Sequence, residues 1–442
     1  MAIQPVETVV TIVGLGYVGL PTALSFHEAG FSVRGVDVSD SVITSLKSGK
    51  APFKDEGLEI SIPVNSDRWE VGNEFHPLVQ DSDVVLITVP TPVDETKTPD
   101  LSYVRSASRS VLENINPDSH TIVALESTVF PGVTREVMDE LCEDLALSQG
   151  ENVTIAYSPE RVSPGDPLRS VGGVARIVGC DDSDVGIFLA ELYSFITSEG
   201  SSYVGAIEVA EASKLIENVQ RDIDIAFANE LATFLPKIGL DVEQVLDAAS
   251  TKWNFHRHNP GLGVGGHCIP VDPYYYLELS EKIGKRSPIS EAARGINESM
   301  PRHSASEVLQ ILKVNGIESS RVLVLGFSYK PETGDIRDTP VREFTRILHD
   351  SGSEVLIWDP FVESKSLPEW VAPVEQPLDL EDLDIVVIAT AHSKCLEIDW
   401  IEMSKSLKSP MIYDGRRALS VEKMRSLGWE YFGVGFPNSP DQ

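Results

Sequence analysis

Short apolar, β-branched runs alternate with helical stretches in two parts of this chain. In the first third, such runs predict strands that start at Val9 and that span residues 83–89, 121–125 and 153–157. In the last third, residues 321–360 repeat the order strand, loop, helix, strand, and another strand follows at 385–389. Apolar strands separated by helices are typical of parallel sheets covered on both faces. The pattern therefore predicts an α/β protein with two Rossmann-like, doubly wound domains.

A long helix without proline is predicted between these two parts, over residues 205–235. Most of its surface is apolar, so we expect it to be buried. Its apolar surface exceeds what one domain would cover, which makes it a candidate dimerisation helix. A second, amphipathic helix is predicted at 241–250. We therefore predict a central helical region, at residues 205–303, that joins domains at residues 1–204 and 304–442.

Four polar residues interrupt the apolar surface of the long helix: Glu211, Lys214, Asn218 and Arg221. At 100° per residue they lie within a sector of about 80°, on one narrow face. A charged residue on a buried helix is costly unless it is paired. Glu211 and Lys214 either pair with each other or belong to a ligand-facing stripe, with Lys214 and Asn218 directed at a reaction centre.

The first strand leads into the pattern G-x-G-x-x-G, formed by Gly14, Gly16 and Gly19, and a second strand ends at Asp37. In this motif the first glycine permits a tight turn, the second lets the backbone approach a pyrophosphate, and the third packs helix against strand. Asp37 follows at about the spacing expected for the acid that holds a ribose 2′-OH, which favours NAD over NADP. A purely structural turn between strand and helix is the alternative.

Polar residues also follow the later strands of the first domain. Thr91 and Thr128 come after two of them, and Glu160 and Arg161 come after a third. Because ligands in open α/β sheets bind beyond the carboxyl ends of the strands, all four are candidate ligand contacts. For the two threonines, hydroxyl groups that cap turns are the alternative.

The loop after the first strand of the last third is basic and lacks a second G-x-G-x-x-G. Lys330 and Arg337 in this loop are candidates to bind a nucleotide other than the one expected at the first glycine motif. Arg416 and Arg417 follow a later apolar run, and each is either a ligand contact or a surface charge.

The 442-residue chain has a formal net charge of −32, and its acidic residues are spread along its length. Such a field repels nucleic acid and anionic membranes, so we expect neither as a partner. The acidic surface either serves solubility or reflects a salt-adapted source. The first apolar run follows no basic residue and is broken by glycines, which is unlike a signal peptide or membrane anchor.

Four cysteines, Cys142, Cys180, Cys268 and Cys395, show neither pairing nor metal-ligand spacing. This favours a reducing compartment, and we expect a cytoplasmic protein without a metal site. Cys268 differs from the other three because it lies in "GVGGHCIPVDPYYY", between a glycine-rich run and Asp272. The adjacent His267 is a poor candidate base, since neighbouring side chains on extended backbone point apart.

NAD combined with a nucleophilic cysteine narrows the chemistry. Removal of one hydride from an alcohol needs no thiol, whereas a thiol is needed when an aldehyde goes on to an acid. Cys268 would add to the aldehyde as a hemithioacetal, a second NAD⁺ would take a hydride to leave a thioester, and water would cleave it. Lys214, as a cation, would favour the thiolate, and Asp272 would orient Lys214 or a water.

Over its whole length the chain resembles the UDP-glucose/GDP-mannose dehydrogenase family. The resemblance rests on the motifs "GLGYVGLP", "VPTP", "ESTVFPG", "SPER", "EVAEASKLIENVQRDIDIAFANEL", "GVGGHCIPVDPYY", "LGFSYKPETGDIRDTP" and "IATAHS", in order along the chain. It implies oxidation of a sugar C6 alcohol to a carboxylate with two NAD⁺. The elements "SPERVSPGD", "TKWNF" and "GGHCIPVDPYY" look most like the branch that acts on UDP-N-acetylhexosamines, with UDP-N-acetylmannosamine or UDP-glucose as alternative substrates.

The resemblance also implies roles for individual residues. Cys268 is the nucleophile, Lys214 the proton donor and acceptor, and Glu160 the base for thioester hydrolysis, while Asn218 and Asp272 hold substrate and water. Matches to NAD contacts are Gly14, Gly16, Tyr17, Val18, Gly19, Asp37, Thr91, Thr128 and Arg337, of which Thr128 is also placed among the catalytic residues. Matches to nucleotide-sugar contacts are Glu160, Arg161, Val162, Lys214, Asn218, Arg221, Gly265, Lys330 and Arg416.

The same resemblance makes residues 1–204 the NAD-binding domain and residues 304–442 the UDP-binding domain. Arg257 is the candidate for an arginine supplied by a second subunit of a homodimer. A catalytically idle nucleotide-sugar binding protein is one alternative, but it would lack Cys268 or Lys214, and both are present. A single-step alcohol dehydrogenase that releases the aldehyde is another.

Overall fold

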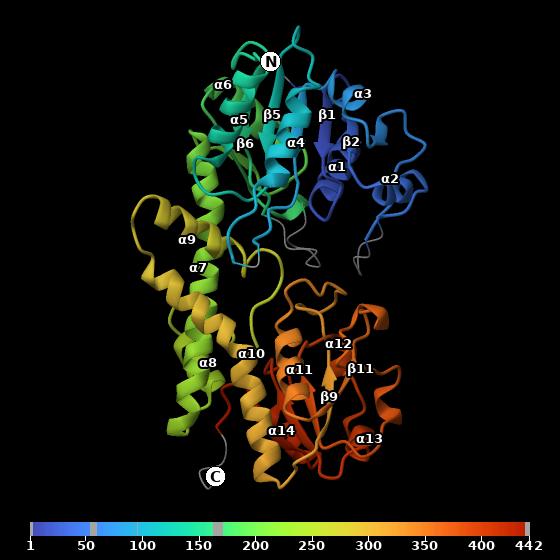
Figure 1. Cartoon of the computed structure of the whole chain (residues 1–442), viewed down its shortest axis with the longest axis vertical. Helices are drawn as coiled ribbons and strands as arrows, with labels where there is room; N and C mark the ends of the chain where they lie inside the picture. Colours follow the sequence, from blue (N-terminus) through green and yellow to red (C-terminus); the bar gives the residue numbers. More distant parts are fainter. Residues whose placement is uncertain (1–2, 54–59, 95, 162–170, 438–442) are drawn as a thin grey trace. The chain divides into compact units, whose positions relative to one another are not determined.

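The computed structural model describes residues 3–53, 60–94, 96–161 and 171–437 (Figure 1). The chain divides into two compact units. Unit 1 holds the residues up to Glu217 together with Tyr274–Lys285, and unit 2 holds Asn218–Pro273 together with the residues from Arg286 onward. Each unit is built on its own, largely parallel sheet with helices packed on it, so the predicted α/β class is confirmed.

The sheet of unit 1 has the order β3-β2-β1-β4-β5-β6-β7-β8. Its strands are β1 (Val9–Val13), β2 (Ser32–Val36), β3 (Trp69–Gly72), β4 (Val84–Ile87), β5 (Thr121–Leu125), β6 (Val153–Tyr157), β7 (Arg176–Cys180) and β8 (Ser201–Tyr203). Neighbouring strands are parallel except for β6 and β7. The strand order reverses beside β1, which pairs with both β2 and β4. Ligands of such sheets bind at this kind of reversal, beyond the carboxyl ends of the strands.

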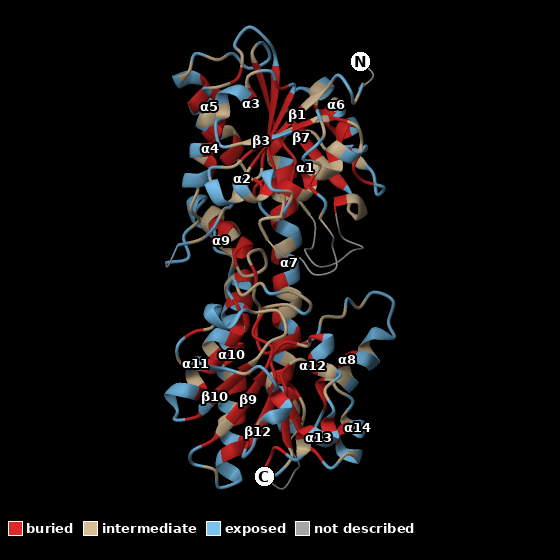
Figure 2. Cartoon of the chain, turned by 90° about the vertical axis from the view of Figure 1, so that its right-hand side faces the viewer, coloured by how far each residue is buried: buried red, intermediate tan, exposed pale blue. Residues whose placement is uncertain are grey.

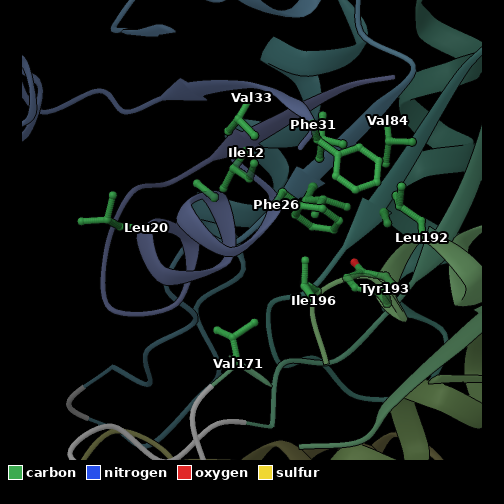
Figure 3. Close-up of a cluster of buried hydrophobic side chains, with 14 of the residues drawn as sticks. Ile12, Leu20, Phe26, Phe31, Val33, Val84, Val171, Leu192, Tyr193 and Ile196 are labelled. Atoms are coloured by element: carbon green, nitrogen blue, oxygen red, sulfur yellow. The ribbon is translucent and has the colours of Figure 1, made fainter. Parts of the chain in front are cut away.

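The helices of unit 1 cover this sheet and close its core. They are α1 (Gly19–Glu28), α2 (Asp40–Lys47), α3 (Phe75–Val79), α4 (Ser102–Leu112), α5 (Val133–Asp144) and α6 (Ser183–Tyr193). In α1 the apolar residues Leu20, Ala23 and Phe26 recur every third position and are buried. Phe26 packs edge to face on Phe31, which follows the helix, with ring centroids 5.4 Å apart (Figure 3). The core thus fixes the helix that follows the glycine motif.

The sheet of unit 2 has the order β11-β10-β9-β12-β13-β14, and all its pairs are parallel. Its strands are β9 (Arg321–Leu325), β10 (Glu354–Trp358), β11 (Ala372–Pro373), β12 (Ile385–Ile388), β13 (Met411–Asp414) and β14 (Glu430–Gly433). Successive residues of β9 enter different cores: Val322 and Val324 belong to one apolar cluster, and Leu323 and Leu325 to another. The strand is therefore buried on both faces, as Figure 2 also shows.

The helices of unit 2 are α8 (Val242–Ser250), α10 (Pro288–Val314), α11 (Pro340–Asp350), α12 (Ser393–Leu396), α13 (Trp400–Ser404) and α14 (Val421–Ser426). The long α7 (Ile207–Phe234) confirms the predicted central helix; it begins in unit 1 and ends in unit 2. Helix α9 (Asp272–Lys282) begins in unit 2 and ends in unit 1. The boundary predicted at residues 303–304 lies within α10, and the scheme of three domains stays a prediction. None of the described helices is long and apolar enough to cross a membrane.

Candidate active site

The glycine motif forms a tight turn between β1 and α1. Gly14 has a φ of 94°, which disfavours side chains, and its N–H donates to the Val36 carbonyl at 2.8 Å. A Cβ added at Gly19 would lie 1.8 Å from the Gly14 oxygen, so α1 approaches the turn only because position 19 is glycine. A Cβ added at Gly16 would meet no atom within 4 Å. Gly16 therefore faces open space at a helix N-terminus, where backbone can approach a phosphate.

Asp37 lies directly after β2 and beside this turn. Its Oδ2 accepts the Leu15 N–H at 2.8 Å, and its Oδ1 accepts the Ser39 N–H at 2.9 Å. The carboxylate thus holds the turn, and each oxygen keeps a lone pair for a ribose hydroxyl. Tyr17 stacks on Phe53, with ring centroids 4.1 Å apart. Val18, the remaining candidate of the motif, directly precedes α1.

Thr91 and Thr128 follow the neighbouring strands β4 and β5. Ser127, beside Thr128, is buried and donates its hydroxyl to the Val89 carbonyl at 2.6 Å. This bond joins the two loops that carry the threonines, a role for Ser127 that sequence reasoning missed. The structure thus brings the candidate NAD contacts of unit 1 to the ends of β1, β2, β4 and β5.

Glu160 and Arg161 follow β6. Arg161 forms a two-bond ion pair with Glu217 of α7, with Nε and Nη2 at 3.0 and 2.6 Å, and it donates to the Ala175 carbonyl. Glu217 therefore holds the guanidinium at the rim of the sheet, which the sequence did not indicate. Val162 lies outside the described residues.

Glu211 is fully buried and connects α7 to α5 within unit 1. Its carboxylate accepts the backbone N–H groups of Gly132 at 2.6 Å and Thr134 at 2.9 Å. Burial raises the pKa of Glu211, and these hydrogen bonds oppose the rise. Glu211 thus caps the start of α5, a role distinct from both alternatives considered for it. Lys214, one turn further along α7, is buried, with 8% of its surface exposed.

Glycines shape the loop that carries Cys268 in unit 2. A Cβ at Gly265 would lie 2.6 Å from the Tyr329 Cβ, and Gly266, with a φ of 93°, donates its N–H to the Arg337 carbonyl at 3.2 Å. The loop therefore lies flat against the segment that holds Lys330 and Arg337. In that segment, the Lys330 carbonyl accepts the Ser328 hydroxyl at 2.9 Å.

Cys268 is half-buried, and its carbonyl begins α9 by accepting the N–H groups of Val271 at 3.0 Å and Asp272 at 2.8 Å. Asp272 is buried, and its Oδ2 accepts a hydrogen bond from the Nδ2 of Asn218. Asp272 lies one helical turn after the candidate nucleophile, and the structure brings it together with Asn218 of α7. Arg221, the next candidate along α7, is exposed.

The arginines of unit 2 differ in how they are paired. Arg416 donates through Nε to the Ala389 carbonyl at 2.7 Å, but its Nη2 is buried and has no hydrogen-bond partner among the described residues. Burial lowers the pKa of Arg416 to about 10, which means that its charge is poorly compensated. Arg417, by contrast, forms a two-bond ion pair with Asp241 at 2.8 and 2.9 Å. Neither is a surface charge, and Arg416 has a buried nitrogen with donor capacity left for an anion.

Two further candidates are held by neighbouring acids. Arg337 pairs with Asp335, and this pair, against the opposing effect of burial, keeps the pKa of Asp335 below its usual range. Arg257 pairs with Glu243 and Asp247 and donates to the Asn259 side chain at 2.9 Å. All these contacts of Arg257 lie within unit 2, and its use by a second subunit stays a prediction.

Three family models match the chain in succession. They are the NAD binding domain (residues 8–197), the central domain (residues 208–299) and the UDP binding domain (residues 323–421) of the UDP-glucose/GDP-mannose dehydrogenase family. The chain belongs to this family. The glycine turn, with open space at Gly16 and an acid after β2, fits the NAD that the first domain binds. Arg416, whose buried Nη2 has no partner among the described residues, lies within the part matched by the UDP binding domain.

Two named members of the family share about a third of their residues with the chain. It is 35% identical to a UDP-N-acetyl-D-glucosamine 6-dehydrogenase of Pseudomonas aeruginosa, over 94% of the chain and 98% of the relative. It is 34% identical to a UDP-N-acetyl-D-mannosamine dehydrogenase of Pyrococcus horikoshii, over 96% and 99%. A solved structure described as the UDP-D-ManNAc dehydrogenase of Pyrococcus horikoshii matches with a TM-score of 0.87 at 31% identity, covering 97% of this chain and 99% of that one.

Proposed function

We propose that the protein is a nucleotide-sugar 6-dehydrogenase that oxidises the C6 alcohol of a UDP-N-acetylhexosamine to the uronic acid through a thioester on Cys268. The observation that carries the proposal is the arrangement around Cys268. Its loop is shaped by glycines, and its carbonyl begins the helix whose first residue, Asp272, is bonded to Asn218. Cys268 and Asp272 lie within one helical turn of each other, and the Asn218 amide reaches the same carboxylate from α7. A thiol, a carboxylate and an amide are groups that a thioester route uses.

In this mechanism NAD, when bound, accepts the hydride released in each of the two oxidations. The Cys268 thiolate adds to the C6 aldehyde and forms a carbon–sulfur bond, while Lys214 donates the proton that the aldehyde oxygen takes up. Oxidation of the adduct leaves a thioester on Cys268. Water attacks the thioester carbonyl, Glu160 accepts the proton from water, and the sulfur leaves as thiolate. Asn218 and Asp272 orient the sugar and the attacking water.

The nucleotide part of the substrate is proposed to bind in unit 2. Lys330, Gly265 and Arg416 all belong to this unit, and the buried Nη2 of Arg416 is a donor that a diphosphate oxygen would satisfy. The similarity to a glucosamine and to a mannosamine dehydrogenase supports an N-acetylhexosamine. We place the gluco- or galacto-configured sugar first, with UDP-N-acetylmannosamine and UDP-glucose as alternatives.

The test is the stoichiometry of the purified protein with a panel of UDP-sugars. With a limiting amount of its preferred UDP-N-acetylhexosamine and excess NAD⁺, two NADH should form per sugar, with a uronic acid as product. One NADH per sugar with accumulated aldehyde would instead establish a single-step dehydrogenase. Binding of UDP-sugar without NADH formation from any member of the panel would favour the non-catalytic binding protein.

We also propose that the protein forms a homodimer through α7. In the part of α7 that belongs to unit 2, Phe227 and Phe234 are 52% and 45% exposed, and Ile238 beyond the helix is 67% exposed. The spacing of seven residues places Phe227 and Phe234 on one face of α7, while Ile238 adds exposed apolar surface beyond the end of the helix. Phe227→Glu should therefore lower the mass found by light scattering to that of a monomer, whereas an unchanged mass would exclude this face. The four cysteines form no disulfide, which supports a cytoplasmic location.

A further inference from the structure

Four polar side chains form a connected, buried network between α7 and α10 in unit 2. They are Asp222, Asn229, Arg294 and Asn297, and each is at most 3% exposed. Asn297 donates through Nδ2 to the Oδ1 of Asp222 at 2.7 Å and to the Asp222 carbonyl at 2.9 Å. Asn229 donates to the Oδ1 of Asn297 at 2.8 Å, and the Nε of Arg294 lies 3.3 Å from the Oδ2 of Asp222. None of these residues belongs to the candidate active site described above.

Both ends of this network bind the backbone of the loop that carries Cys268. The Oδ1 of Asn229 accepts the N–H of Gly261 at 3.0 Å. The Nη1 of Arg294 donates to the carbonyl of Ile269, the residue next to Cys268, at 3.4 Å. The loop from residue 261 to residue 269 is therefore held at its two ends by side chains of two different helices.

The order of these contacts leaves each side chain little choice of orientation. Because Asn297 donates to Asp222, its Oδ1 faces Asn229, and Asn229 must then turn its amide group toward Asn297 and its oxygen toward Gly261. The Nε of Arg294 and the Oδ2 of Asp222 lie 3.3 Å apart without the geometry of a hydrogen bond, so the attraction of opposite charges holds the guanidinium whose Nη1 reaches Ile269. Each contact to the loop thus depends on the contact behind it.

Stability alone is a weak reason for such a network. Burial raises the pKa of Asp222, and Arg294 and Asn297 oppose the rise, so the carboxylate and its partners are desolvated together. A buried ion pair is often no more stabilising than apolar residues of similar volume. The same two helices also supply buried apolar packing to unit 2, since Ala232 of α7 and Met300, Ala305 and Val308 of α10 belong to one apolar cluster. Buried amides such as those of Asn229 and Asn297 fix geometry, because each must meet its hydrogen-bond partner.

We propose that Asp222, Asn229, Arg294 and Asn297 are positioning residues that hold the Cys268 loop in its reactive geometry. This inference rests on the proposed role of Cys268 as the nucleophile. The residues touch neither the thiol nor the sugar, and they act through the backbone at Gly261 and Ile269.

Two variants and one matched control test the proposal in the full-length protein. Asn229→Ala removes the acceptor for Gly261, and Arg294→Lys keeps a cation beside Asp222 but shortens the reach to Ile269. Val308→Ala opens a cavity on α10 outside the polar network, because Val308 is fully buried in the apolar cluster and no hydrogen bond of the network involves it. All three variants should unfold at a lower temperature than the parent protein.

Kinetics separate a positioning role from a structural one. Displacement of a reacting group by about 1 Å can reduce a rate by about 100-fold. Asn229→Ala and Arg294→Lys should lower kcat by about 10- to 100-fold, with the KM for NAD⁺ and UDP-sugar within about twofold of the parent values. Val308→Ala should keep kcat within about twofold of the parent value below its unfolding temperature.

A second readout needs no turnover. The rate at which iodoacetamide alkylates Cys268, followed by mass spectrometry over a range of pH, should change in both network variants and stay the same in Val308→Ala. If all three variants match the parent in kcat and alkylation, the network serves only the packing of α7 on α10 and the inference is wrong. If Cys268→Ser retains turnover, the proposed nucleophile fails, while the alkylation profiles still decide whether the network positions the loop.

Discussion

The Nδ2 of Asn218 donates a hydrogen bond to the Oδ2 of Asp272, and this bond joins α7 to the residue with which α9 begins. The N–H of the same aspartate bonds to the Cys268 carbonyl at 2.8 Å. The buried Asp272 therefore has a fixed orientation relative to both the backbone of the candidate nucleophile and the amide of Asn218. The structure thus brings Asn218 and Asp272, which are 54 residues apart in the sequence, into direct contact.

Replacement of Asp272 by asparagine tests this arrangement. Asp272→Asn keeps the size of the side chain but places an amide opposite the Asn218 amide, so one of the two must turn or lose its partner. We expect kcat to fall by about 100-fold or more, because proton transfer or water orientation is disturbed, while NAD⁺ affinity is kept. Steady-state kinetics and a binding titration measure both. A variant with parental kcat would show that the carboxylate serves only to begin α9.

The role of Cys268 is tested by Cys268→Ser. Serine keeps a nucleophile of similar shape but is a far poorer leaving group, so turnover should fall by about 1,000-fold or more. UDP-sugar and NAD⁺ should still bind, and a trapped sugar ester would add its mass to the peptide that contains residue 268. His267→Ala is the control and should be milder. Loss of activity in His267→Ala with near-normal uronate production by Cys268→Ser would reverse the two assignments.

Cofactor choice is expected to depend on Asp37. A 2′-phosphate would meet its carboxylate, so the unmodified protein should strongly prefer NAD⁺ over NADP⁺. Asp37→Ala should erode that preference and also lower the unfolding temperature, because the Leu15 and Ser39 N–H groups lose their acceptor. The ratio of kcat/KM for the two cofactors measures the first effect, and calorimetry the second. Equal use of NADP⁺ by the unmodified protein would mean that Asp37 does not reach the ribose.

The thiols of the chain should differ in reactivity with pH. Burial raises the pKa of Cys142 and Cys180 to about 11 and that of Cys395 to about 12. A raised thiol pKa means that the folded state favours the protonated thiol. The stability that this preference contributes is complete at a pH below the thiol pKa of the unfolded chain, and it is lost as the pH rises through 11 to 12. Iodoacetamide at pH 8 should therefore modify Cys268 alone in the folded protein, which peptide mass mapping can verify. Labelling of the three buried thiols at the same rate would contradict this.

Arg416 should couple protein stability to nucleotide binding. The buried Nη2 without a partner and the lowered pKa indicate that the charge of Arg416 reduces the stability of the ligand-free protein. Arg416→Met should therefore change the unfolding temperature of the ligand-free protein little or raise it, and should reduce the rise that UDP causes. Arg417→Met, which breaks the ion pair with Asp241, should instead destabilise the protein with or without UDP. Differential scanning fluorimetry distinguishes the two, and an undiminished UDP effect in Arg416→Met would exclude it as a phosphate contact.

Much of the fold could be predicted from the sequence because the central strands are continuous apolar runs. The edge strands β3 and β8 could not be predicted in this way, since their residues are only partly buried and their pattern is mixed. Helix α10 was missed for another reason. Pro301 lies inside it, and an internal proline normally suggests that a helix ends, so the pattern does not indicate one continuous helix there.

The candidate site could be predicted where local backbone geometry demands a residue type, as at Gly14 and Gly19. The buried partners could not, because helical periodicity does not say which face of a long helix meets which neighbour. Glu211 was grouped with Lys214 by its angle on α7, but its partners are backbone groups at the start of α5. The roles of Asp222 and Asn229 could not be predicted for the same reason, since their partner Asn297 belongs to α10.

The bond between Glu211 and the start of α5 limits how the parts of this protein can be exchanged with those of relatives. A chimera joined near residue 204 would combine α5 from one parent with α7 from the other. Unless the incoming helix brings a carboxylate to position 211, two backbone N–H groups would be left in the interior without an acceptor. The useful crossover point for recombination therefore lies beyond Glu211, and the exchangeable module is longer than the nucleotide-binding sheet itself.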